Sequence, residues 1–347
     1  MTIIYALVHM AVDLACAFLM FAFVWGRGNW YLWMLVYNFC AFAMQMPVGA
    51  LADRLNRNSL VAVTGCGGVL AGLALGMAGH PGAACVAAGM GNACFHVGGG
   101  IDVLNRSGNR AAMLGVFVAP GALGIFLGTM LGRSGPGAVL WIGGAMVLGA
   151  AVIRLASVRN RLWDHSGNAP AAYDRLTLKQ ILAVCCFFCA VVLRSYSGMI
   201  QHFPWKDTVV GSAWLLTGAV VLGKMAGGVL ADRIGVSQAA LRSMCAATVG
   251  FMCLTSPLPG ILAVLCWNMS MPLTLWAVAR VFPGAKGFSF GLLTFGLFLG
   301  FCPAYLEGGG INAGGWGARA ASSPEGMALM AILSIFLLNW GLKQVTE

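Results

Sequence analysis

A six-residue pattern, Gly-x-Leu-Ala-Asp-Arg, occurs twice in this chain, at residues 49–54 and, 179 positions later, at 228–233. Each copy ends a long apolar segment and places an acid beside a base where that segment gives way to polar sequence. In a chain of 347 residues, a repeat at this distance predicts two similar halves built on the same plan.

The composition places both halves in a membrane. The chain is 60% hydrophobic and 9% charged, and so few charged residues cannot cover the surface of a soluble domain of this length. The net charge of +10 does not indicate a nucleic-acid partner, because the basic residues lie in short loops between apolar segments. The first apolar segment continues as a spanning helix without a cleavage site, so no signal peptide is expected.

Twelve segments have the ~20 apolar residues that a membrane-spanning helix needs. We expect these spans near 2–25, 29–52, 59–79, 83–105, 110–132, 137–158, 180–203, 209–231, 237–257, 259–282, 286–306 and 324–343. The expected fold is an all-α integral membrane protein with twelve transmembrane helices in two pseudo-symmetric six-helix bundles. The bundles comprise residues 1–158 and 180–347, and a polar cytoplasmic linker, 159–179, joins them.

The distribution of Lys and Arg predicts the orientation. With the N-terminus inside, fourteen of these residues lie on the cytoplasmic side and four on the other, a strong positive-inside bias. We therefore expect a multi-pass protein of a bacterial-type inner (plasma) membrane with both termini cytoplasmic. The two remaining cations, Arg194 and Lys224, fall within spans.

The repeated pattern itself predicts a conformational latch. Asp53 and Asp232 lie at cytoplasmic helix ends, where a carboxylate can bind a neighbouring helix N-terminus or an arginine. Contacts of this kind can hold one conformation closed and break in another, whereas an ordinary solvated helix end would explain one copy but not two. The candidate latch residues are Gly49, Asp53, Arg54, Arg57, Gly228, Asp232 and Arg233.

The two copies, each after the second span of a six-span half, resemble the signature loop of the major facilitator superfamily. The first copy continues to Arg57 as that signature expects, while the second has Gly235-Val236-Ser237 and lacks the later base. The resemblance implies a transporter whose two bundles rock against each other and expose a central site to either side in turn.

A finer resemblance is to the fosmidomycin-resistance group of that superfamily, which implies efflux by antiport and drug resistance. The residues that carry it are His9-x-x-x-Asp13, the run from Gly91 to His96, Leu193-Arg194-Ser195, and Pro272 with Pro283, Gly284, Gly287 and Gly291. The group usually has a proline after the histidine of the fourth span, and here Val97 follows.

Ionisable groups in the membrane invite a functional hypothesis, because each costs at least ~2.5 kcal/mol to insert. Asp13 lies roughly 16 Å into the first span, near the midplane, and His9 lies one turn earlier on the same face. We hypothesise that Asp13 carries a coupling proton and that His9 tunes or relays it, since imidazole titrates near neutral pH. The alternative is a static buried salt bridge between Asp13 and Arg194.

Arg194 occupies nearly the same place in the second half that Asp13 occupies in the first. The resemblance implies that the first spans of both halves line one central cavity, which these two side chains would share. Two cations in the spans against one mid-membrane acid favour an anionic substrate, which Arg can bind through paired hydrogen bonds. The candidate substrate-binding residues are Arg194, Lys224, His96, Asn92, Gln45, Tyr196 and Asn268.

Two of the polar residues in the fourth span also have structural interpretations. A helix–helix hydrogen bond would explain His96 as well as a role in a cavity does. Asp102, near the cytoplasmic end of its span, is interpreted as facing Arg106, one turn further on.

The sequence therefore predicts a proton-coupled exporter of a small anionic or amphiphilic compound. The alternatives are a proton-coupled importer of an organic anion and a receptor or scaffold that transports nothing. We expect no enzyme, cofactor or metal, because the spans show no metal-ligand spacing, nucleophile–base pair or P-loop. The expected partners of this monomer are a small-molecule substrate, protons and the lipid bilayer.

Overall fold

The computed structural model describes residues 1–159, 176–306 and 316–346, and every regular element in these ranges is a helix. Most of the predicted linker, 160–175, lies outside the described residues. The helices of the first half are α1 (Thr2–Leu19), α2 (Trp30–Asn38), α3 (Gln45–Leu55), α4 (Asn58–Met77), α5 (Pro81–Ser107), α6 (Ala112–Val118), α7 (Pro120–Arg133) and α8 (Val139–Arg159).

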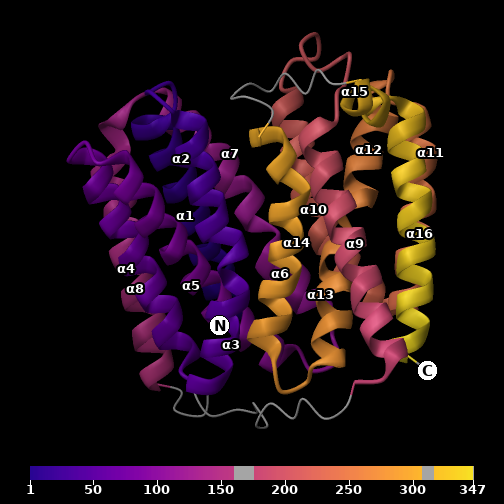
Figure 1. Ribbon diagram of the computed structural model, residues 1–347, viewed down its shortest axis with the longest axis horizontal. Coiled ribbons are helices and arrows are strands. Elements are labelled where there is room, and N and C mark those ends of the chain that lie inside the picture. Colours follow the sequence, from indigo (N-terminus) through magenta and orange to yellow (C-terminus); the bar gives the residue numbers. More distant parts are fainter. Residues whose placement is uncertain (160–175, 307–315, 347) are drawn as a thin grey trace. The chain divides into compact units, whose positions relative to one another are not determined.

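The second half continues in the same manner (Figure 1). Its helices are α9 (Leu178–Ile200), α10 (Ser212–Ile234), α11 (Val236–Met252), α12 (Pro257–Asn268), α13 (Ser270–Val281), α14 (Lys286–Leu306), α15 (Trp316–Ser322) and α16 (Pro324–Thr346). Short π-helical segments, Met20–Val24 and Phe39–Ala43, extend α1 and join α2 to α3. One residue separates α6 from α7, and one residue separates α12 from α13. When consecutive segments of this kind are counted as one helix, the described residues form twelve long helices.

Ten of these twelve long helices are long and apolar enough to cross a membrane. The other two are α11, of 17 residues, and α5, whose 27 residues include Asn92, His96 and Asp102. Polar side chains lower the mean hydropathy of α5, and burial inside the protein is what allows a helix of that composition to stand among apolar ones. The predicted all-helical fold of twelve long helices is confirmed.

The chain forms two compact units, and each takes a short segment from the opposite half. Unit 1 comprises Met1–Gly108, Pro120–Tyr173 and Phe282–Phe295, and unit 2 comprises Asn109–Ala119, Asp174–Val281 and Gly296–Glu347. The boundaries expected from the sequence, 1–158 and 180–347, do not include this exchange. The exchanged segments contain the first turns of α6 and α14. Asp232 and Asp53, from the repeated pattern, accept hydrogen bonds from these two helix starts.

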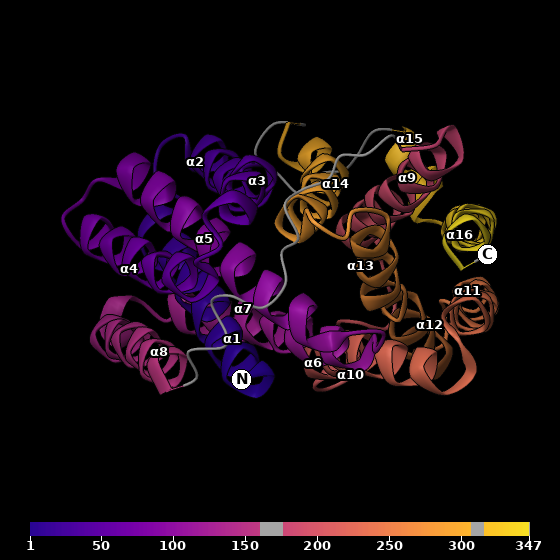
Figure 2. The same cartoon turned by 90° about the horizontal axis from the view of Figure 1, so that it is seen from below.

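Glycines let the helices of unit 1 approach closely. Gly124 and Gly128 on α7 lie against α1, and a methyl group at either would come 2.2 Å from a backbone oxygen of Met10 or Leu14. On α5, a methyl group at Gly98 would come 2.4 Å from the backbone oxygen of Asn58 on α4. Figures 1 and 2 show α7 beside α1 and α4 beside α5. Small residues at such spacing allow tight helix packing in membranes.

Substitution of one of these glycines tests the packing. We expect Gly128→Ala to destabilise the protein by ~1–3 kcal/mol, because the added methyl group overlaps the backbone oxygen of Leu14. The matched control is Gly144→Ala, since a methyl group at Gly144 on α8 would meet nothing within 4 Å. Thermal unfolding in detergent measures both, and equal melting temperatures for the two variants would contradict the assigned packing.

Candidate functional site

The candidate site lies in unit 1, where α1 and α5 run antiparallel with polar side chains facing each other. On α1, Tyr5, His9 and Asp13 lie four residues apart and therefore share one face. Each is hydrogen-bonded or ion-paired to a residue of α5: Tyr5 to Asp102, His9 to His96, and Asp13 to Asn92. The order along α5 is reversed, as antiparallel packing requires.

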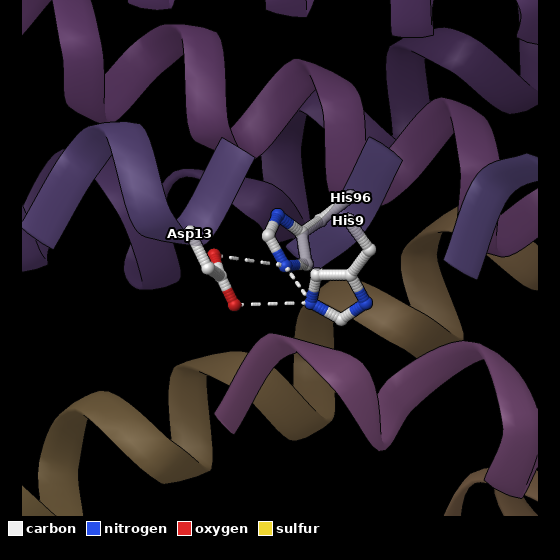
Figure 3. A group of neighbouring side chains, drawn as sticks. All are labelled: His9, Asp13 and His96. Carbon is white, nitrogen blue, oxygen red and sulfur yellow. Dashed lines mark hydrogen bonds and ion pairs between the residues drawn. The ribbon is translucent and has the colours of Figure 1, made fainter. Parts of the chain in front are cut away.

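The centre of this arrangement is a buried cluster of His9, Asp13 and His96, whose polar atoms point toward one another (Figure 3). His9 Nε2 lies 3.1 Å from Asp13 Oδ2 and 2.8 Å from His96 Nε2. His96 Nε2 lies 3.6 Å from Asp13 Oδ1, which also accepts a hydrogen bond of 3.1 Å from Asn92 Nδ2. The three residues are at most 9% exposed.

Hydrogen-bond chemistry assigns a donor and an acceptor to the two rings of this cluster. The Nδ1 atom of His96 lies 2.9 Å from the backbone oxygen of Asn92, which can only accept, so Nδ1 is the donor. In its neutral form His96 therefore has an acceptor at Nε2, opposite His9 Nε2. With Nε2 of His96 as the acceptor, Nε2 of His9 is assigned as the donor in the hydrogen bond between the two rings.

The same three atoms are close enough together to be considered as metal ligands, since all lie within 4.8 Å of one another. Sequence spacing did not predict this set, because His96 comes from a helix that is distant along the chain from His9 and Asp13. The separation of 2.8 Å between the two ring nitrogens is shorter than the ~3.3 Å expected between two ligands of a tetrahedral zinc ion with bonds of ~2.0–2.1 Å. The separation therefore suits a hydrogen bond between the two rings better than a tetrahedral zinc ion.

Gly121, in the first turn of α7, leaves room for the cluster. A methyl group at this position would come 2.4 Å from Asp13 Oδ2 and 2.5 Å from His9 Nε2. Sequence analysis did not identify Gly121 as a site residue. Its only local signal is the pair Pro120-Gly121, where α6 gives way to α7.

A second buried carboxylate, Asp102, lies near the other end of the same helix pair. Its Oδ2 accepts a hydrogen bond of 2.6 Å from the hydroxyl of Tyr5, and its Oδ1 accepts one of 2.9 Å from Asn58 Nδ2 on α4. Asp102, Tyr5 and Asn58 are at most 2% exposed. The sequence interpretation considered only Arg106 as a partner, because a pattern along one helix cannot show donors that come from two other helices.

In unit 2, Arg194 on α9 is buried, at 8% exposed. Its Nη1 donates a hydrogen bond of 3.2 Å to Ser270 Oγ, at the start of α13. Behind it, Ser197 Oγ donates to the backbone oxygen of Arg194 and accepts from Trp267 Nε1. Among the described residues of unit 2, Arg194 has no carboxylate partner. Asp13 belongs to unit 1, so the cavity shared by the two side chains stays a prediction.

The remaining candidates are not members of the histidine cluster. Gln45 in unit 1 is fully buried and donates to the backbone oxygen of Ala41, in the π-helical segment that precedes α3. In unit 2, Lys224 Nζ lies 3.4 Å from the backbone oxygen of Val118, and Asn268 donates to Val264 on its own helix. Tyr196 is half-buried on α9.

Both aspartates of the repeated loops bind the N-terminal turn of another helix. The carboxylate oxygens of Asp53 accept hydrogen bonds from the backbone N–H groups of Gly287 and Phe288, at 2.8 and 2.9 Å, in the first turn of α14. Asp232 accepts from Ala111 and Ala112, at 2.6 and 3.1 Å, where α6 begins. A negative charge in this position also interacts favourably with the helix dipole.

The glycines of the repeat make these contacts sterically feasible. A methyl group at Gly49 would come 2.1 Å from the backbone oxygen of Gly287, and one at Gly228 would come 2.5 Å from that of Ala111. Arg54, Arg57 and Arg233 are exposed, and their part in a latch stays a prediction.

Comparison with known proteins identifies the fold. No family model and no curated protein matches the chain by sequence. Among solved structures, the human organic anion transporter MFSD10 superposes with a TM-score of 0.68 at 15% identity, covering 96% of this chain and 99% of that one. The E. coli fucose:proton symporter FucP gives a TM-score of 0.61 at 14% identity, covering 99% and 97%.

A further structure of FucP, in the outward conformation, gives a TM-score of 0.56 at 13% identity and covers 98% of this chain and 99% of that one. The chain is thus a multi-pass helical membrane protein. Its fold is that of the major facilitator superfamily, to which FucP belongs. The finer resemblance to the fosmidomycin-resistance group is not tested by these comparisons.

The helix-binding aspartates lead to a stability prediction. We expect Asp53→Ala to lower the free energy of unfolding by ~1–2 kcal/mol, because two N–H groups of α14 lose their acceptor and the helix dipole loses its counter-charge. Arg54→Ala, at the exposed neighbouring position, is the control. Thermal unfolding of the purified protein measures both, and an Asp53→Ala protein as stable as Arg54→Ala would refute the assignment.

Proposed function

We propose that this protein is a secondary active transporter that works by alternating access and exports a small anionic or amphiphilic compound in exchange for protons. The fold supports the transporter class, since FucP and MFSD10, which share it at low identity, carry small solutes. One of these is described as a proton symporter and the other as an organic anion transporter. We further propose a monomer in a bacterial-type inner membrane, with both termini in the cytoplasm.

The observation that carries the proposal is the buried contact of His9, Asp13 and His96. Three titratable groups buried within hydrogen-bonding distance inside a membrane bundle would be expensive to retain for packing alone. Their other titratable neighbours are Cys16 on the same helix and Tyr37 on α2. Because imidazole and carboxylate exchange protons readily, a conformational change that opens the cluster to one side allows a proton to enter or leave there.

Arg194 supports an anionic substrate. A guanidinium has five N–H donors, and the described residues of unit 2 supply no carboxylate to it. A carboxylate or phosphonate of the substrate would complete its coordination through paired hydrogen bonds. We propose Lys224, also in unit 2, as a second cation that attracts the negative charge of the substrate.

Alternating access requires contacts that form in one state and break in another. We propose that the contacts of Asp53 with α14 and of Asp232 with α6 are these latches, together with the flanking residues of each repeat. Their strength suits this role, since a few hydrogen bonds to a helix N-terminus can be broken at modest cost.

Import is the second candidate, because transport of an organic anion together with protons needs the same site and differs only in the direction of coupling. FucP, a symporter on the same fold, favours keeping this alternative. The direction of flux under an imposed pH gradient separates the two.

Asp13→Asn tests the proton coupling. In proteoliposomes with an imposed pH gradient, we expect the wild type to drive a panel of phosphonates and carboxylates against their concentration gradients. The variant should lose this uphill transport, because the amide cannot exchange a proton, but should keep exchange of labelled for unlabelled substrate. Asp207→Asn, at an exposed position between α9 and α10, is the control. Full uphill transport by Asp13→Asn, or transport that requires an added divalent metal ion instead of a pH gradient, would contradict proton coupling at this site.

Arg194→Lys tests the anion preference. The substitution keeps the charge and removes the planar pair of donors, so we expect the KM for a transported carboxylate or phosphonate to rise roughly ten- to a hundredfold. Arg27→Lys, at an exposed position, should leave the KM unchanged. Uptake of radiolabelled anion measures both, and an unchanged KM in Arg194→Lys would remove this residue from the substrate site.

A further inference from the structure

The two buried carboxylates of the α1–α5 pair share an unusual arrangement. Each accepts a hydrogen bond at Oδ1 from the side-chain nitrogen of a buried asparagine: Asn92 for Asp13, at 3.1 Å, and Asn58 for Asp102, at 2.9 Å. Both asparagines are at most 2% exposed. In both, the side-chain oxygen Oδ1 is buried and has no hydrogen-bond partner.

An amide oxygen without a donor is unfavourable in the interior of a protein, so its presence twice beside a carboxylate calls for an explanation. An ionised carboxylate has no hydrogen to give, whereas a protonated carboxyl group has one O–H donor. Protonation of either aspartate therefore supplies the donor that the neighbouring amide oxygen lacks. After a small rotation of the asparagine side chain, two hydrogen bonds can join the acid and the amide: the amide N–H donates to one acid oxygen, and the acid O–H donates to the amide oxygen.

We propose that Asp102, held by Tyr5 and Asn58, is a second proton-binding site in unit 1, separate from the cluster around Asp13. In the ionised state its carboxylate accepts from the Tyr5 hydroxyl and from the Asn58 amide. In the protonated state its hydroxyl donates to Asn58 Oδ1. Both states are satisfied by the same two neighbours, so a proton can come and go without leaving a charge unsupported.

Asp102 lies near the end of the bundle at which α1 begins, and we propose that it exchanges its proton at that end. Tyr5 lies in the first turns of α1, and Asp102 lies five residues before the end of α5. Asp13 lies eight residues along α1 from Tyr5, which corresponds to roughly 12 Å. The ring of Phe95, which is fully buried, has its centroid 6.5 Å from that of Tyr5 and 6.2 Å from that of His9. We therefore expect the two carboxylates to titrate as separate sites.

The charged groups on the elements around Asp102 are already engaged or lie toward the end of the bundle. From α14, Lys286 donates to Asn105, and from α3, Asp53 accepts from Gly287 and Phe288. On α5 itself, Arg106 follows one turn after Asp102, and Arg57, immediately before α4, is exposed. Tyr5 is the titratable side chain of α1 that contacts Asp102, and the amino group of Met1, just before α1, interacts electrostatically with Arg106.

The role of this site in transport rests on the proposed proton coupling, but proton binding to it does not, and the two can be measured separately. Infrared difference spectra of the reconstituted full-length protein, recorded over a series of pH values, report protonated carboxyl groups through their C=O stretch. We expect two buried carboxyl bands in the wild type, one of which is lost in Asp13→Asn and the other in Asp102→Asn. Asp207→Asn, at an exposed position, should leave both bands in place.

An Asp102→Asn spectrum identical to that of the wild type would overturn the second site. A spectrum that loses a band in Asp102→Asn but not in Asp13→Asn would overturn the proposed role of Asp13 and leave the second site standing.

Tyr5→Phe tests the same site without removing the acid, in case Asp102→Asn does not fold. The phenylalanine keeps the ring and removes the hydroxyl that donates to the carboxylate, so the ionised form loses one hydrogen bond. We expect the midpoint of the Asp102 band to move to higher pH by about one to two units, the size expected for one hydrogen bond to a charged group. The Asp13 band should keep its midpoint. A Tyr5→Phe spectrum with neither band shifted would also overturn the proposal.

Discussion

The antiparallel contact of α1 with α5 is the interaction on which the candidate site depends. In a membrane, polar side chains must find their partners inside the protein, because lipid offers none. Tyr5, His9 and Asp13 meet this requirement through one helix, and their partners follow in reverse order along α5. A rotation of either helix would leave several of these groups unpaired at once. The polar contacts therefore fix the register of the pair as well as forming the site.

Glycine allows the helices next to that contact to pack closely against it. Gly121 leaves space beside Asp13 and His9, and Gly98 brings α4 close enough for Asn58 to reach Asp102. The same principle applies at the repeated loops, where Gly49 and Gly228 let a helix N-terminus approach the aspartate four residues further on. Close backbone approach and polar pairing thus occur together in this protein. Without the close approach of the helices, a buried charge would lack its partner.

The two units contribute different chemistry to the proposed function. Unit 1 holds carboxylates and imidazoles, which can exchange protons, while unit 2 holds Arg194, a fixed cation suited to an anion. A carrier that moves a proton and an anion needs both kinds of group. The proposed coupling links the proton site of unit 1 to the anion site of unit 2.

Sequence patterns were enough to predict that the chain spans a membrane many times and has two similar halves, and to select His9, Asp13 and Arg194 as polar residues within the spans. Hydropathy and a repeated six-residue pattern suffice for this, since both are local properties of the chain. The contact of His96 with His9 and Asp13, the binding of Asp102 by Tyr5 and Asn58, and the place of Gly121 beside the cluster became visible only in the folded protein. These partners come from helices far apart along the chain, and only the packing of those helices determines which of their faces meet.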